Sequence, residues 1–216
     1  FDYSLFDKRL SGSFDYFNRY IHDMVGPAIE LPAILGTDVP LANNTDLKTW
    51  GFEYEVQWRD FLKSGLGYNI KLLLSDSQTR ILKYSNPTNS LTKYREGQMM
   101  GEIWGYTTEG IAQTQEEMDN HLAALPEGGQ NALGIDWSPG DIMYKDINGD
   151  GKIDWGENTA DNPGDVSVIG NSTPRYSFGL DMSLNYKGFD FRAFFQGVLK
   201  RDIFQDKYYF WGIDGS

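Results

Sequence analysis

Residues 175–187, RYSFGLDMSLNYK, decide the fold, because every even position is apolar and every odd position is polar, charged or glycine. Strict alternation predicts a β-strand with one wet face and one apolar face. The apolar face begins at Tyr176 and ends at Tyr186, with leucine and methionine in the middle. At a tilt of about 45°, about ten steps of roughly 3.3 Å rise about 23 Å, close to the apolar band of about 25 Å between the aromatic girdles of outer-membrane barrels. The stretch has the pattern of a membrane-spanning barrel strand.

This strand alone also fits a soluble β-sandwich, whose core face alternates in the same way. The buried face of a strand shows one pattern whether it meets protein or lipid. Both interpretations are therefore open at this point, and the rest of the chain has to decide between them.

The composition of the chain narrows the class of protein. Its 216 residues carry a formal net charge of −12, which argues against nucleic acid and anionic lipid headgroups as partners, since both select for lysine and arginine. An aromatic content of 15% with a mean hydropathy of −0.49 suits a barrel, in which half of each strand faces water. No apolar run approaches the roughly 18 residues of a membrane helix, and no cysteine is present to form a disulfide. The chain begins within a strand-like pattern, so we expect it to be part of a longer protein.

Five other stretches are predicted to be strands. Alternation is complete at 50–58 and has two interruptions at 13–23. The segment 24–48 holds three prolines and two glycines, which predicts a long loop. The predicted strands occupy residues 1–6, 13–23, 50–58, 66–74, 175–187 and 189–199.

The connections between these strands alternate between short and long. Turns of a few residues follow 1–6, 50–58 and 175–187, whereas long segments occupy 24–48 and about 75–171. Sandwiches have no reason to sort loop length by side, but outer-membrane barrels have short periplasmic turns and long extracellular loops. The sequence therefore predicts an all-β fold, a segment of an antiparallel transmembrane β-barrel. Six strands cannot close a barrel, so this would be part of the wall of a larger one.

The chain divides into three predicted parts. Residues 1–76 are predicted to be barrel strands with one long extracellular loop at 24–48. Residues 77–171 are predicted to be a large extracellular loop region with structure of its own, because structureless loops beyond roughly 12–15 residues are uncommon. Residues 172–216 are predicted to be barrel strands and the start of the next extracellular loop.

One helix is predicted within the large loop region. Thr114 followed by Glu117 is a capping-box pattern, in which each residue satisfies a free backbone N–H of the first turn. The helix is expected to run to about Leu125, because Pro126 and Gly128 follow.

Residues 146–157, DINGDGKIDWGE, match the twelve-residue calcium loop position by position. Calcium takes six to eight oxygen ligands, and this spacing wraps them around one point, with Gly151 at the sharp turn. Lys152 would offer its backbone carbonyl, and Glu157 can bind through both carboxylate oxygens. The predicted ligands are Asp146, Asn148, Asp150, Lys152, Asp154 and Glu157.

A plainer interpretation of these residues is a turn that solvates itself through Asx-turns. The helices that usually flank a calcium loop are missing, since a Pro-Gly pair precedes it at 139–140 and another follows at 163–164. Between Asp141 and Asp165, however, seven acids and two bases leave a local charge of −5, which strains the fold unless a cation offsets it. We expect one calcium ion with a structural role.

Covalent catalysis finds little support, and we expect no enzyme. No Ser/His/Asp or phosphate-loop signature is present, and His22 and His121 have no partner pattern and are expected at the surface. The aromatic residues of the loops could stack on sugar rings, but a small core beneath a loop is favoured. They are Trp104, Tyr106, Trp137, Trp155, Tyr208, Tyr209 and Trp211.

Several blocks of sequence, taken in order, carry a family resemblance. They are LSGSFD (10–15), GFE (51–53), YREG (94–97), GY (105–106), QEE (115–117), GDIMYKDINGDGKID (140–154), IGNSTPRY (169–176), YKGFD (186–190) and FQG (195–197). In this order the blocks resemble the SusC/RagA family of TonB-linked outer-membrane transporters over essentially the whole chain.

The resemblance implies more than the spacing shows. Members of the family are 22-stranded barrels with an N-terminal plug, and they pair with a SusD-type surface lipoprotein that covers the barrel. They import oligosaccharides or peptides across the outer membrane of Gram-negative bacteria, driven through TonB. This chain would be a C-terminal part of the barrel, and TonB would act on a region outside it. Two alternatives stay open: a secreted, calcium-stabilised β-sandwich that binds glycan, and a passive porin.

Overall fold

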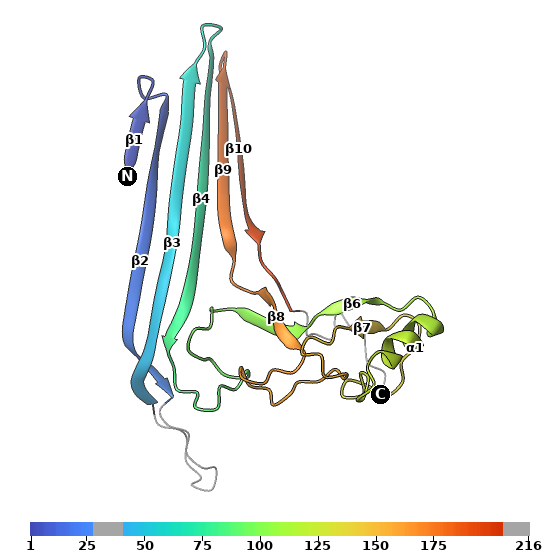
Figure 1. Ribbon diagram of the computed structural model, residues 1–216. Coiled ribbons are helices and arrows are strands. Elements are labelled where there is room, and N and C mark those ends of the chain that lie inside the picture. The colour runs from blue at the N-terminus through green and yellow to red at the C-terminus, as the bar shows by residue number, and fades with distance from the viewer. Residues whose placement is uncertain (28–40, 205–216) are drawn as a thin grey trace.

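Six strands form one antiparallel sheet in the computed structural model, which describes residues 1–27 and 41–204 (Figure 1). The strands stand side by side in the order β1-β2-β3-β4-β9-β10. Their bounds are β1 Asp2–Leu5, β2 Leu10–Pro27, β3 Leu41–Phe61, β4 Leu66–Lys83, β9 Arg175–Tyr186 and β10 Phe189–Lys200. All six predicted strands are present, and the sheet joins two groups that lie far apart in the sequence.

The short turns lie together at one end of the sheet, and the long connections leave from the other (Figure 1). Residues 6–9, 62–65 and 187–188 make the short turns. Gly65 and Gly188 have φ angles of 88° and 85° there, which glycine adopts without a steric penalty. Loop length is thus sorted by side, as the sequence predicted.

The predicted loop at 24–48 is wrong at both of its ends. Strand β2 continues to Pro27 and β3 begins at Leu41, with Val25 paired to Asn43. Residues 28–40, in the middle of that prediction, lie outside the described residues. Strand β4 likewise continues to Lys83, so the large loop region begins at residue 84 rather than 77.

These extensions were missed because their sequence does not alternate. Residues 43–46, NNTD, lie in β3, and residues 75–80, SDSQTR, lie in β4, and both are polar throughout. A backbone ladder continues wherever neighbouring strands can pair, but alternation needs one apolar face. In β3 and β4 the ladder therefore continues through stretches that have no apolar face.

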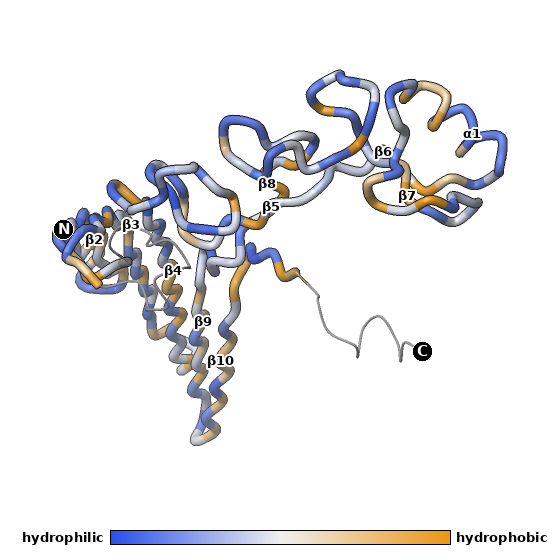
Figure 2. The backbone as a smooth tube through the Cα atoms, turned by 90° about the horizontal axis from the view of Figure 1, so that it is seen from below, coloured by the Kyte–Doolittle hydropathy of each residue, from blue (hydrophilic) through white to orange (hydrophobic). Residues whose placement is uncertain are grey.

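The register sorts the side chains into an apolar face and a polar face. Leu180 in β9 is paired with Leu72 in β4 and with Phe195 in β10, so three apolar side chains share one face. The alternation is visible along β4, β9 and β10 in Figure 2. On the other face, Lys71 forms an ion pair of 2.7 Å with Glu55.

Aromatic residues lie at both ends of the apolar face. At the turn end, Trp58 Nε1 donates to the Tyr68 hydroxyl across β3 and β4 at 3.1 Å. At the loop end, Trp50 lies in β3 and Tyr176 at the start of β9. Two aromatic bands therefore bound an apolar stretch.

The sheet itself has almost no buried core. Apolar side chains in it are exposed, including Ile70 at 42%, Leu184 at 44% and Phe195 at 53%. Within residues 1–27 and 41–204, the other sheets have two strands each, and no second sheet packs on the six-stranded one. A sandwich buries one face of each sheet, and the described residues form no such arrangement among themselves.

The loop region, residues 84–174, carries structure of its own. Strands β5 (Glu102–Tyr106) and β8 (Val166–Asn171) form one antiparallel pair, and β6 (Thr108–Ile111) and β7 (Ile142–Tyr144) form another. The helix α1 spans Gln115–Ala123. Most buried hydrophobic residues of the described chain belong here: Ala112, Met118, Leu125, Ile153 and Val166.

The predicted helix is confirmed, with a different capping partner. The Thr114 hydroxyl accepts from the Glu117 N–H at 3.2 Å, as a capping box requires. The Glu117 carboxylate, however, accepts from the Gln113 N–H at 2.8 Å instead of returning to Thr114. No helix among the described residues is long and apolar enough to cross a membrane.

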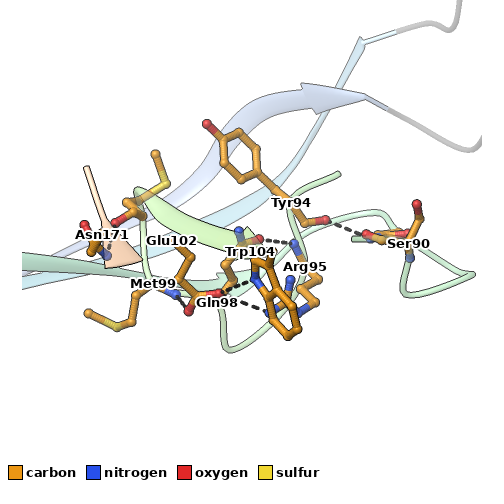
Figure 3. A network of polar contacts seen from close by, with 10 residues as sticks. Ser90, Tyr94, Arg95, Gln98, Met99, Glu102, Trp104 and Asn171 are labelled. Atoms are coloured by element: carbon orange, nitrogen blue, oxygen red, sulfur yellow. Dashed lines mark hydrogen bonds and ion pairs between the residues drawn. The ribbon is translucent and has the colours of Figure 1, made fainter. Parts of the chain in front are cut away.

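A polar cluster fixes the start of the loop region beside the end of β4 (Figure 3). Glu102 pairs with Arg95 at 3.1 Å, and both side chains are only 12% exposed. Glu102 also accepts from Trp104 Nε1 at 3.2 Å and from the Met99 N–H at 2.8 Å. The Arg95 guanidinium lies 4.6 Å from the centre of the Trp104 ring.

Residues 97–100 attach the loop region to β4 through backbone hydrogen bonds along the edge of β4 that β9 does not reach. Met100 N–H, for example, donates to the Thr79 carbonyl at 2.9 Å.

The chain returns from the loop region at the same place. Asn171, labelled in Figure 3, donates through Nδ2 to the Met100 carbonyl at 3.0 Å. Thr173 Oγ1 donates to the same carbonyl at 2.9 Å. Ser172 N–H donates to the Gly101 carbonyl at 2.7 Å. The outgoing and returning segments are therefore bonded to each other before β9 begins.

Candidate functional site

The acidic loop, residues 146–157, is wrapped around its own side chains. The two carboxylate oxygens of Asp146 accept from the N–H groups of Gly149 and Gly151 at 2.6 Å and 2.9 Å. Asn148 accepts from the Asp150 N–H at 2.9 Å, and Asp150 accepts from the Lys152 N–H at 3.2 Å. These are the Asx-type turns of the plainer interpretation, and they also hold the oxygens on one side of the loop.

A residue outside the twelve-residue pattern, Asp165, anchors the acidic loop. Its side chain is fully buried. One carboxylate oxygen accepts from the Ile147 and Asn148 N–H groups at 2.8 Å and 3.5 Å, and the other accepts from the Asp154 N–H at 2.9 Å. Asp165 therefore joins the beginning of the acidic loop to its later half.

A tight turn brings Asp165 back to the acidic loop. Asp165 N–H donates to the Asp154 carbonyl at 2.9 Å, and Glu157 N–H donates to the Asn162 carbonyl at 3.0 Å. Gly156 and Gly164 let the two segments approach, because a Cβ on Gly156 would lie 2.6 Å from Gly164 N. The chain thus folds back on itself after residue 157.

Three carboxylates converge at this point. Asp146, Asp150 and Asp165 each offer an oxygen, and these three oxygens lie within 4.8 Å of one another. Asp146 and Asp150 belong to the predicted ligand set, and Asn148 lies between them, with its Nδ2 donating to Asp150 at 3.0 Å. The donor set is oxygen only, the kind that calcium prefers.

The later predicted ligands are engaged differently. Lys152 Nζ forms an ion pair of 2.7 Å with Asp154, whose other oxygen accepts from the Gly156 N–H at 2.8 Å. The hydrogen bond from Lys152 lowers the pKa of Asp154, and the same bond raises the pKa of Lys152. Glu157 is not among the three converging carboxylates, because its backbone leads into the turn that returns to Asp165.

Aromatic rings pack beside the acidic loop. Tyr106 in β5 lies 5.0 Å from the Trp155 ring, edge to face, and 5.4 Å from the Tyr144 ring. Burial, together with the negative charges of Asp154 and Asp165, raises the pKa of the Tyr106 hydroxyl. Tyr106 is half-buried against its neighbours, as the predicted small core beneath a loop requires, but Trp155 is 44% exposed and does not fit that prediction.

The other loop aromatics are placed as follows. Trp104 packs against Arg95 in the cluster of Figure 3. Trp137 packs near Gly134, where an added Cβ would lie 3.3 Å from the indole. Tyr208, Tyr209 and Trp211 lie outside the described residues.

One histidine prediction is wrong. His22 is exposed at 64% of its side chain, as predicted, but His121 is exposed at only 9%. His121 Nε2 lies 3.0 Å from the oxygen of Gln130, a fully buried side chain that also accepts from the Tyr144 N–H at 2.6 Å. His121 lies on the inward face of α1, and Gln130 joins that helix to β7.

Sequence reasoning missed Asp165 and Gln130. Neither belongs to a motif, since each acts on backbone groups that come close only in the folded chain. The Pro-Gly pair at 163–164 indicated a turn before Asp165. It gave no sign of which segment the turn would face.

Comparison with known proteins supports one class for this fold. No family profile matches the chain. Three proteins of Formosa agariphila match it: TonB-dependent receptor P3 at 28% identity over 94% of this chain, TonB-dependent receptor P26 at 23% over 93%, and TonB-dependent receptor P39 at 22% over 95%. The chain spans about a fifth of the length of these relatives, 20% for the first two and 22% for the third.

Solved structures show the same fold. The RagAB peptide importer in its closed-closed state matches with a TM-score of 0.59 at 15% identity, over 91% of this chain and 20% of that one. The open-open state of the same importer gives 0.60 at 17% identity, over 90% of this chain and 19% of that one. Each of these proteins is named as a receptor or an importer. The resemblance to SusC/RagA-type TonB-dependent transporters is therefore confirmed.

Proposed function

We propose that this chain forms part of the wall and a large extracellular loop of a TonB-dependent importer in the outer membrane of a Gram-negative bacterium. The six-stranded sheet carries the proposal, because its apolar face is exposed and bounded by aromatic residues at both ends. Such a face is stable when lipid covers it. The polar face, with Glu55 and Lys71, would then line the interior of the barrel.

Closure into a barrel would also pair the backbone groups at the two edges of the sheet, which belong to β1 and β10. Strand β10 pairs with β9 on one side, and β1 pairs with β2 along only four residues. Unpaired strand edges invite association, and closure into a barrel removes them. We propose further strands of the same barrel at both edges, making up the 22 that the resemblance implies.

The proposed cargo is an oligosaccharide or a peptide, and the proposed partner is a SusD-like lipoprotein on the outer surface. The structural neighbours are described as parts of a peptide importer, and the loop region is large enough to carry a docking surface. We expect the intact protein, extracted from outer membranes in mild detergent, to copurify with a lipoprotein in a large complex. We also expect it to migrate differently on gels with and without boiling.

Two results would contradict this proposal. A protein recovered in the aqueous fraction without detergent, with unchanged migration on boiling, would exclude the barrel. A heat-modifiable barrel that always purifies alone would exclude the lipoprotein partner while leaving the wall assignment intact.

We further propose that the acidic loop holds one structural calcium ion. The convergence of Asp146, Asp150 and Asp165 supports this proposal, and Asn148 and the Lys152 carbonyl would complete an oxygen-only set. Calcium would offset the local charge of −5 and fix the loop. Glu157 would contribute less than its place in the motif suggests.

Calcium affinity should depend more on the three converging carboxylates than on Glu157. We expect Asp150→Asn to weaken calcium binding by about tenfold or more, because it removes an exposed charge from the cluster. Glu157→Gln, which removes the same charge, should have a smaller effect. Titration calorimetry of both variants tests this, and equal losses or no calcium binding by the wild type would contradict it.

A further inference from the structure

Two cations lie on the apolar face of the sheet just beyond its aromatic band. Tyr20, Lys48 and Arg80 face one another across β2, β3 and β4. Lys48 Nζ lies 5.3 Å from the centre of the Tyr20 ring and 5.8 Å from that of Trp50. The Arg80 guanidinium carbon also lies 5.8 Å from the Trp50 centre. We call these four residues the rim patch.

The rim patch lies at the end of the sheet from which the loop region projects. Lys48 is two residues beyond Trp50 along β3, a rise of roughly 7 Å. Aromatic bands mark the boundary between the hydrocarbon and the headgroups of a membrane. Side chains one step beyond the band and on the same face therefore lie level with the headgroups.

Within residues 1–27 and 41–204, the charges of the rim patch have no carboxylate partner. Among the described residues, neither Lys48 nor Arg80 forms an ion pair. A nearby acid, Asp46, accepts instead from the Asp23 N–H at 2.9 Å and lies 3.4 Å from His22. The cations of the polar face differ, because Lys71 is paired with Glu55 and Arg192 with Asp181.

We propose that the rim patch binds the phosphate groups of membrane lipids. Lysine and arginine close to a membrane surface attract anionic headgroups, and the ring faces of Tyr20 and Trp50 hold both cations at the height where lipid phosphates lie. The net charge of −12 argued against anionic lipid as a partner, but that charge is an average over a chain with a strongly acidic loop. Locally, the lipid-facing rim is positive.

This inference rests on the proposed function, because lipid reaches this face only if the sheet spans a membrane. Its test uses the intact protein in zwitterionic detergent, titrated with phosphatidic acid or phosphatidylcholine and followed by native mass spectrometry. The test variant carries Lys48→Gln with Arg80→Gln. The control carries Lys8→Gln with Lys63→Gln, which removes the same charge from exposed side chains at the turn end of the sheet.

We expect phosphatidic acid to bind the wild type more tightly than phosphatidylcholine. The affinity should fall about fivefold for each rim cation removed, or about 25-fold in the test variant, and should change little in the control. Heat-modifiable migration of both variants shows that the barrel is folded. Equal affinity for phosphatidic acid in all three folded proteins, or equal losses in both variants, would show that the rim patch does not bind lipid phosphate. Neither result would contradict the barrel. A protein that needs no detergent would instead overturn the proposed function.

Discussion

Replacing Asp165 with alanine is expected to unfold the acidic loop while leaving the six-stranded sheet folded. The buried carboxylate accepts from the N–H groups of Ile147 and Asp154. Each buried donor left without an acceptor costs about 1–3 kcal/mol, so the loop should lose about 2–6 kcal/mol of local stability. Hydrogen exchange at the two amides measures this loss, and limited proteolysis should cut between residues 139 and 164.

Asp161→Ala is the matched control for this experiment. It removes the same carboxylate from the same turn, but Asp161 is exposed and accepts one hydrogen bond, from Asn89 at 3.0 Å. Its effect on exchange at Ile147 and Asp154 should be small. Equal protection in the two variants would show that Asp165 does not anchor the loop.

An arginine in place of Leu180 is expected to destabilise the protein by about 2–4 kcal/mol, the cost of that side chain at the midplane on the lipid face of a barrel. Leu180 lies near the middle of the apolar face, between Leu72 and Phe195. Denaturant unfolding in lipid vesicles measures the difference from the wild type.

Gln196→Arg provides the comparison on the polar face. Gln196 lies beside Phe195 in β10 and opposite Gly179, which has no side chain to crowd it. In the proposed barrel an arginine there would lie in the water-filled interior, so it should cost far less than Leu180→Arg. Equal costs at the two positions would mean that both faces meet the same medium, which excludes a barrel wall.

The sequence predicted the strands where one face is apolar, and it failed in stretches such as 43–46 and 75–80, which are polar on both faces. Strict alternation at 175–187 and 50–58 placed β9 and the middle of β3 correctly. At 43–46 the polar residues looked like a loop, yet they pair with β2. Strand pairing there depends on backbone hydrogen bonds, which do not require apolar and polar side chains to alternate.

The candidate site was predictable only as far as its ligands lie close in the sequence. Asp146, Asn148 and Asp150 are spaced so that local turns bring their oxygens together. Asp165, eight residues beyond the motif, reaches the same point because the chain turns back between them. Glu157 fitted the motif but follows the chain into that turn, away from the cluster. The spacing of residues within the motif cannot predict the contact of Asp165, because that contact forms only when the chain folds back on the acidic loop.

The bonds between residues 100–101 and 171–173 make the loop region an exchangeable part. The outgoing and returning segments meet beside the sheet at one point, where the Met100 and Gly101 carbonyls accept hydrogen bonds from residues 171–173. We expect insertions, deletions and substitutions between these residues to leave the pairing of β4 with β9 unchanged. If the chain has the proposed function, evolution would be free to alter what the loop region meets outside the cell without changing the strands that insert into the membrane. Related importers with different cargoes should differ most within this segment and least in the strands on either side of it.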